Sequence, residues 1–79
     1  MIDAVQEKVI SIIQEMKSIS IDSSDALIED GVLDSFDIIN LIMALESAFQ
    51  ISIPGEAIVP ENLGNVRDIA KLVCNQQSQ

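Results

Sequence analysis

The segment 34–50 constrains the fold most, because neither glycine nor proline interrupts its regular pattern of apolar residues. Its apolar residues recur at helical spacing and form one continuous face: Leu41, Ile42, Leu45 and Phe49. Asp34 and Ser35 at its start are good helix caps, since their side-chain oxygens can accept hydrogen bonds from free backbone N–H groups. The segment therefore predicts an amphipathic helix that begins at Asp34 or Ser35 and runs to about Gln50.

Two further stretches show the same spacing. One spans Val5–Met16 after a possible cap at Asp3, and its apolar stripe consists of Val5, Val9, Ile12, Ile13 and Met16. The other is a last helix, with Asn65 as the expected N-cap and Asp68 as the third helical residue. Its expected buried side consists of Val66, Ile69, Ala70, Leu72 and Val73. The polar tail 75–79 follows and should fray.

The segments between these helices are typical of loops. Serine and aspartate are frequent between the first two helices and predict a long loop with a short turn near 26–29. The segment 51–55 should end the second helix, and a short helical turn between 56 and 63 must hold Pro60 in its first turn or end there. We therefore expect one all-α domain over residues 1–79, a small bundle of three to four helices with a long loop between the first two.

Composition excludes several classes of function. The chain has 79 residues, of which 48% are hydrophobic and 3% aromatic, so it should fold around one aliphatic core that leaves no room for a large enclosed active site. Its net charge of -9 disfavours nucleic acid and favours partners with basic patches. We also expect no membrane span and a cytoplasmic location, because no apolar run is long enough and the first residues do not resemble a signal peptide.

The chain carries little catalytic equipment. It contains no histidine, no tyrosine and no glycine-rich phosphate loop, and its one cysteine, Cys74, is expected to pack within a helix. The oxygen-rich segments 22–25 and 29–31 do not have the spacing of a calcium-binding loop. We therefore expect neither catalytic residues nor a metal site.

One motif lies where the long loop meets the second helix: Gly31-Val32-Leu33-Asp34-Ser35-Phe36-Asp37. An Asp-Ser pair alone is a common helix cap. Around it, in order, lie Leu27–Gly31, Leu41–Glu46, Phe49, Ile51–Pro54 and Val66–Ile69. In this combination the chain resembles the acyl and peptidyl carrier protein family over residues 5–73.

The resemblance implies an acyl-carrier-like bundle in which Ser35 carries 4′-phosphopantetheine, placed there from coenzyme A by a phosphopantetheinyl transferase. The arm's thiol would hold an acyl or aminoacyl group as a thioester, so the protein would be a non-catalytic carrier in a biosynthetic pathway. A helix N-terminus favours an anionic phosphodiester by about 0.3–1 kcal/mol. Asp34 and Asp37 oppose this effect, and because stability does not explain them we expect them to face a basic surface of a partner.

Two departures from the fatty-acid carriers indicate another pathway. Val32 and Leu33 separate Gly31 from the Asp-Ser pair, where those carriers have one residue, and Phe36 replaces the usual Leu or Met. The longer spacing is similar to that of stand-alone aminoacyl or secondary-metabolite carriers, such as the D-alanyl carrier proteins. We therefore expect a specialised pathway.

The second helix is also expected to dock partner enzymes. Its apolar arc is too wide to be buried on one side, so Ile39 and Met43 should be exposed. The expected docking residues are Asp34, Phe36, Asp37, Ile39, Asn40, Met43 and Glu46. They would meet basic or apolar patches on the transferase and on loading and acceptor enzymes, and the carrier itself is expected to be a monomer.

Two other functions remain open from the sequence. An acidic helical interaction module without a cofactor would bind a basic partner whether or not Ser35 is present. A divalent-cation binder would show saturable calcium affinity at physiological salt.

Overall fold

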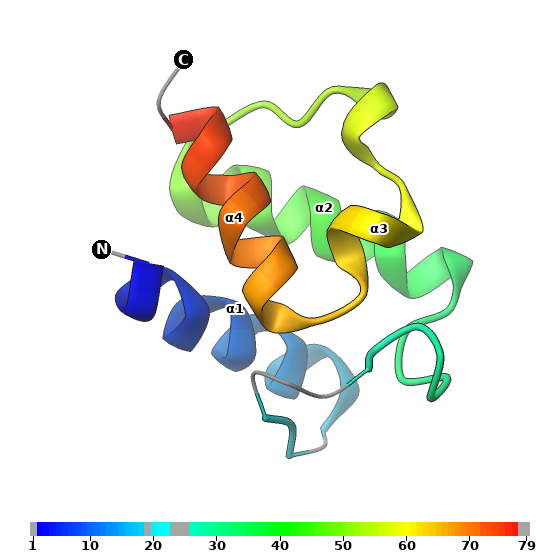
Figure 1. Cartoon of the computed structure of the whole chain (residues 1–79). Helices are drawn as coiled ribbons and strands as arrows, with labels where there is room; N and C mark the ends of the chain where they lie inside the picture. Colours follow the sequence, from blue (N-terminus) through cyan, green and yellow to red (C-terminus); the bar gives the residue numbers. More distant parts are fainter. Residues whose placement is uncertain (1, 19, 23–25, 78–79) are drawn as a thin grey trace.

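A computed structural model describes residues 2–18, 20–22 and 26–77, with residues 2 and 3 described by their backbone alone. The described residues form helix α1 (Ile2–Lys17), helix α2 (Ser35–Phe49), a single 3-10 turn η1 (Gly55–Ala57), the short helix α3 (Pro60–Leu63) and helix α4 (Val66–Gln77). Figure 1 shows the long loop between α1 and α2 and the connection from α2 to α4, which contains α3. The expected all-α bundle with a long first loop is confirmed.

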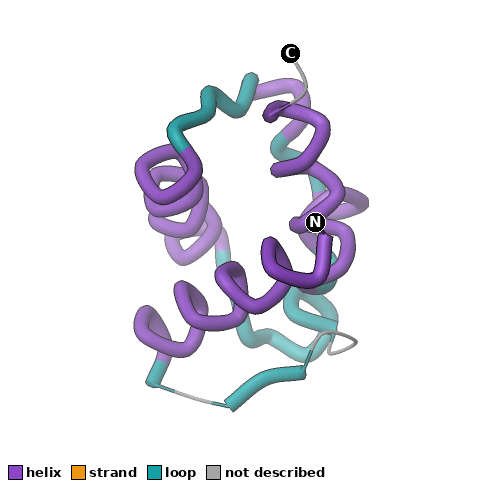
Figure 2. The backbone as a smooth tube through the Cα atoms, turned by 90° about the vertical axis from the view of Figure 1, so that its left-hand side faces the viewer, coloured by secondary structure: helices purple, strands orange, loops and turns teal. Residues whose placement is uncertain are grey.

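The three long helices enclose one aliphatic core. Helix α1 runs below α2 and α4 in the view of Figure 2 and contacts both of them. Among the residues whose side chains are described, fifteen hydrophobic side chains are buried: Val5, Val9, Ile13, Leu27, Leu33, Leu41, Ile42, Leu45, Ile53, Leu63, Val66, Ile69, Ala70, Leu72 and Val73. Full burial of such an aliphatic side chain stabilises a fold by about 1.5–3 kcal/mol, so this core is the main source of stability.

Helical spacing predicted most of the core. All five residues expected on the inner side of α4 are buried, as are Leu41, Ile42 and Leu45 of α2. Ile12, Met16 and Phe49 are only partly buried and pack against the core from its edge. The helical stripes are therefore confirmed, with their outer members at the border of the bundle.

The ends of the helices differ in part from the prediction. Helix α1 already begins at Ile2, so the expectation that Asp3 is its N-cap is wrong. Helix α4 extends to Gln77 and so includes most of the polar tail, of which residues 78 and 79 lie outside the described part.

The connection from α2 to α4 contains two short helical pieces where one was expected. Residues 51–54 have no regular secondary structure, with Pro54 in an extended conformation, and η1 and α3 follow. Pro60 is the first residue of α3, where a backbone N–H would have no partner inside the helix and its loss costs nothing. Among the described helices, none has the length and apolar character needed to cross a membrane.

Candidate functional site at the start of helix α2

Two buried leucines fix the loop that leads into α2. Leu27 and Leu33 are almost completely buried, and the Leu33 N–H donates a hydrogen bond of 2.9 Å to the Leu27 carbonyl. The Leu27 N–H donates to the carbonyl of Gly64, between α3 and α4, at 2.7 Å. These bonds attach the end of the long loop to the corner before α4, so the first residue of α2 has a defined place.

Gly31 allows the turn between these leucines. Its φ is +75°, in the left-handed region of backbone conformation that residues other than glycine adopt only with strain. Its N–H donates to the Ile28 carbonyl at 3.1 Å, which closes the turn. The motif glycine therefore has a backbone role, and the two residues Val32 and Leu33 that follow it bring the chain to Asp34.

Asp34 is the N-cap of α2 and forms a reciprocal capping box with Asp37. The Asp37 N–H donates to Asp34 Oδ1 at 2.8 Å, and the Asp34 N–H donates to Asp37 Oδ2 at 3.3 Å. An N-cap side chain of this type stabilises a protein by about 1 kcal/mol. The expectation that stability does not explain these two acids is therefore wrong, because both satisfy backbone donors at the helix start.

Asp37 also binds Lys17 from the last turn of α1. Lys17 Nζ lies 2.7 Å from Asp37 Oδ2, and both side chains are partly buried. The hydrogen bond from Lys17 lowers the pKa of Asp37, with a smaller contribution from the backbone bond to Asp34 and partial burial acting against them. The same hydrogen bond raises the pKa of Lys17. The pair joins the end of α1 to the first turn of α2 and was not predicted from the sequence.

Ser35 is the first residue of α2 and its side chain is exposed. Within residues 2–18, 20–22 and 26–77, no hydrogen bond occupies its hydroxyl. Asp34 satisfies the N–H of Asp37, while the N–H groups of the first two helical residues, Ser35 and Phe36, have no partner inside the helix. An accessible hydroxyl beside free N–H groups fits a phosphodiester, which these donors can stabilise.

Three large apolar side chains are exposed along α2 beyond Ser35. Phe36 is 72% exposed, Ile39 60% and Met43 55%, so these side chains are oriented to solvent and not to the core. Their spacing of three and four residues places them on one side of the helix, and we refer to them as the apolar stripe. The exposure expected of Ile39 and Met43 is confirmed.

The remaining expected docking residues differ in their exposure to solvent. Asp34 is exposed, whereas Asp37, Asn40 and Glu46 are partly buried. Glu46 Oε2 accepts a hydrogen bond of 2.9 Å from the Ile53 N–H and so holds the chain that leaves α2. This bond was not predicted, because Ile53 lies in a segment without periodic pattern.

Two open depressions on the described surface lie away from Ser35. One is lined by residues at the ends of α2 and α4, including Phe49, Gln50 and Gln77. The other lies between the turn at Ile28 and helix α3. Neither is lined by Ser35, which lies exposed at the start of α2.

Comparison with known families identifies the family of the chain. The profile of the family described as a phosphopantetheine attachment site matches residues 3–73, which include all the described helices apart from the first residue of α1 and the last turn of α4. Members of this family bear 4′-phosphopantetheine on a serine and are non-catalytic carriers of covalently bound intermediates. With its helical bundle and its match over most of its length, this chain belongs to the phosphopantetheine-attachment family of carrier domains.

Proposed function

We propose that Ser35 bears the 4′-phosphopantetheine arm and that the chain presents an acyl or aminoacyl group to partner enzymes. When bound, the arm supplies the thiol that holds this group as a thioester. The residues of the chain position the arm: the Asp34 cap orders the helix start, and the free N–H groups of Ser35 and Phe36 are available to its phosphodiester. The exposed Ser35 hydroxyl at the start of α2 is the observation that carries this proposal.

Mass spectrometry after incubation with coenzyme A and a phosphopantetheinyl transferase tests the attachment. The wild type should gain the mass of one phosphopantetheine, and Ser35→Ala should gain none. Ser47→Ala is the matched control, because Ser47 is also exposed on α2 and its replacement should leave loading unchanged. Loading of Ser35→Ala, or no loading of the wild type, would contradict the proposal and favour an acidic interaction module without a cofactor.

The partners that we propose are the transferase and the enzymes that load and accept the cargo. Docking through the residues expected from the sequence is supported by the exposure of Asp34 and of the apolar stripe on the helix that begins with Ser35. A specialised acyl or aminoacyl pathway is supported by the low charge of α2, whose acidic residues are Asp37 and Glu46. Thioester capture from cells would identify the cargo and test the pathway.

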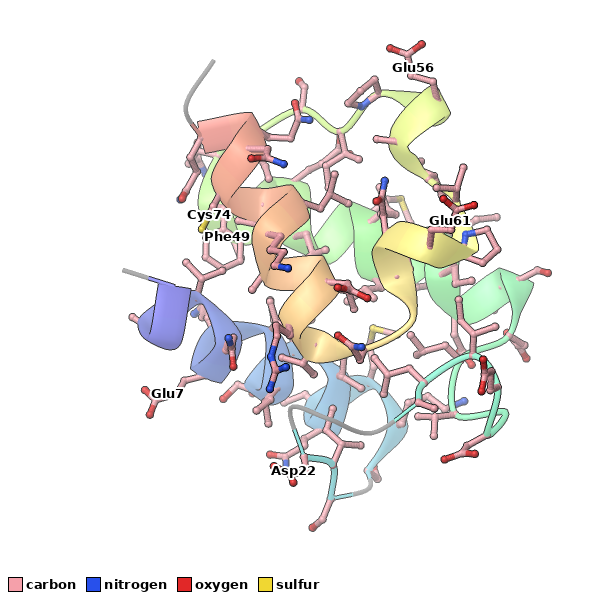
Figure 3. The ribbon with its side chains drawn as sticks, in the orientation of Figure 1. Glu7, Asp22, Phe49, Glu56, Glu61 and Cys74 are labelled. Atoms are coloured by element: carbon pink, nitrogen blue, oxygen red, sulfur yellow. The ribbon has the colours of Figure 1, made fainter. Side chains whose placement is uncertain are left out.

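We also propose that the carrier is monomeric and cytoplasmic. Its net charge of -9 makes copies of the chain repel one another, and acidic side chains such as Glu7 and Glu56 point outward from the body of the molecule (Figure 3). Sedimentation at increasing concentration should give a constant molecular mass near 8.6 kDa. Cell fractionation would check the location.

A further inference from the structure

A single carboxylate oxygen joins the end of α1 to the cap of α2. Asp37 Oδ2 accepts from Lys17 Nζ at 2.7 Å and from the Asp34 N–H at 3.3 Å. In return, Asp34 Oδ1 accepts from the Asp37 N–H at 2.8 Å. Ser35 lies between these two acids in the chain, so the ammonium group of Lys17 contacts the same capping box that encloses the proposed attachment residue.

The backbone at the end of α1 holds Lys17 in this place. Ser18 has a φ of +56°, in the left-handed region, and its N–H donates to the Gln14 carbonyl at 2.7 Å. This turn ends α1 at Lys17. The helix dipole favours a lysine in the last turn of any helix, but that effect concerns α1 alone. The contact with Asp37 brings the same positive charge to the first turn of α2.

The charges of the chain are unevenly distributed along the sequence. Residues 18–65 contain nine acidic residues and neither lysine nor arginine. Lys17 is the last cation before this segment, and the next one, Arg67, lies in the first turn of α4. The start of α2 therefore depends on α1 for a positive charge from its own neighbourhood in the sequence.

Lys17 interacts with both acids of the capping box. Its pKa is raised mainly by the hydrogen bond to Asp37 and, to a smaller extent, by the charge of Asp34. A phosphodiester on Ser35 would add a third negative charge within residues 34–37. Like charges this close in sequence repel one another, and a nearby cation reduces the repulsion.

We infer that Lys17 is the counter-ion of the loaded helix start: it offsets the negative charge that a phosphodiester on Ser35 adds beside Asp34 and Asp37, so that the capping box persists after loading. This inference rests on the proposed function, because it concerns the loaded Ser35. Lys17 is a positioning residue, since it contacts Asp37 and acts on Ser35 through the cap. A purely structural link between α1 and α2 would instead contribute equally before and after loading.

A thermodynamic cycle distinguishes these two roles. The equilibrium constant of unfolding is measured in urea by circular dichroism for the wild type and Lys17→Gln, each before and after loading by the transferase. Loading should raise this constant by roughly twofold to fivefold more in Lys17→Gln than in the wild type, as expected for the loss of one interaction between partly exposed charges. An equal effect of loading on both proteins would overturn the inference.

Two further substitutions separate position from charge. Lys8→Gln is the matched control, because it removes the same charge from an exposed position on α1, and it should show the wild-type effect of loading. Lys17→Arg keeps the positive charge and should also show the wild-type effect. A loading effect in Lys8→Gln as large as that in Lys17→Gln would assign the result to net charge and overturn the inference.

Amide hydrogen exchange locates the effect in the helix. The Asp37 N–H, which donates to Asp34 Oδ1, reports on the capping box, and the N–H of the buried Leu45 reports on the middle of α2. Loading should accelerate exchange at Asp37 in Lys17→Gln and leave it unchanged in the wild type, with Leu45 unaffected in both. Equal acceleration at Asp37 in the two proteins would show that Lys17 does not protect the cap.

Salt tests whether the effect is electrostatic. The Debye length is about 30 Å at 0.01 M salt and about 3 Å at 1 M. The difference between Lys17→Gln and the wild type in the effect of loading should therefore be largest in dilute salt and disappear at about 1 M. A difference that is independent of salt would assign it to packing of the Lys17 side chain and overturn the inference.

A carboxylate introduced at position 35 makes the test independent of loading. Ser35→Asp and Ser35→Asn differ by one negative charge, and the ratio of their unfolding constants should be roughly twofold to fivefold larger when Lys17→Gln is also present. The same ratio with and without Lys17 would overturn the inference. If the wild type gains no phosphopantetheine, the proposed function fails; if it loads but neither cycle depends on Lys17, the inference alone fails.

Discussion

The two sides of helix α2 are similar in hydrophobicity and opposite in environment. Leu41, Ile42 and Leu45 face the core and are at most 6% exposed, whereas Phe36, Ile39 and Met43 are at least 55% exposed. Burial of the inner three stabilises the fold, while the outer three leave their apolar surface in water when the chain is alone. Hydrophobicity alone therefore does not distinguish a buried residue from an exposed one on this helix; the position around the helix does.

Truncation of one side chain on each side of α2 should give the largest difference in the free energy of unfolding. Leu45→Ala removes buried methyl groups from a fully buried site, and we expect it to lower the free energy of unfolding by about 2–5 kcal/mol. Met43→Ala, two residues earlier, should change this free energy by no more than about 0.5 kcal/mol, because the Met43 side chain is already largely in water. Urea denaturation followed by circular dichroism measures both, and equal losses would show that the stripe belongs to the core.

Removal of the helix cap at the start of α2 should have a smaller effect on the free energy of unfolding. Asp34→Ala leaves the Asp37 N–H without its acceptor and should cost about 1 kcal/mol of unfolding free energy. Asp34→Asn keeps an acceptor oxygen and should retain most of the stability. Asp30→Ala removes the same charge from an exposed loop residue and serves as the control in the same denaturation experiment; a loss equal to that of Asp34→Ala would assign the effect to charge alone.

The smallest expected effect is the pH dependence of the stability that the Lys17–Asp37 pair contributes. Because the pKa of Asp37 lies below its usual 3.8, the contribution of the pair is complete above pH 3.8 and is lost as the pH falls through the lowered value. Because the pKa of Lys17 lies above its usual 10.5, the contribution is complete below pH 10.5 and is lost as the pH rises through the raised value.

Unfolding curves of Lys17→Gln and Lys8→Gln, recorded from acid to alkaline pH, check this window. Lys17→Gln should be the less stable variant at neutral pH, and the two should converge at both extremes. A stability difference that is independent of pH would show that Lys17 contributes by packing of its side chain and not by its charge.

Local patterns predicted the parts of this molecule that depend on neighbouring residues. The start of α2 and the N-cap Asn65, whose Oδ1 accepts from the Asp68 N–H at 2.8 Å, were expected because caps and helical spacing act within a few residues. The start of α1 was predicted wrongly, since an aspartate suits both an N-cap and a first helical turn.

Contacts between distant segments could not be predicted in the same way. Lys17 and Asp37 are twenty residues apart, and nothing in either local pattern indicates that the end of α1 lies beside the start of α2. Glu46 was expected at the docking surface from its place on the helix, while its bond to the Ile53 N–H depends on the return of the chain after α2. The accessible serine was therefore predictable from the sequence. The ion pair of Asp37 and the hydrogen bond of Glu46 on the same helix were not.

The direction of α2 has a practical consequence. The first turn of α1 and the last turn of α4 both lie toward the end of α2 at Phe49, away from the end at Ser35 (Figure 1). Because α2 has 15 residues, its ends at Ser35 and Phe49 are about 22 Å apart. A fusion partner, an affinity tag or a solid support joined near the start of α1 or the end of α4 would therefore leave Ser35 facing outward. If Ser35 bears the arm as proposed, immobilised molecules should remain substrates for a loading enzyme.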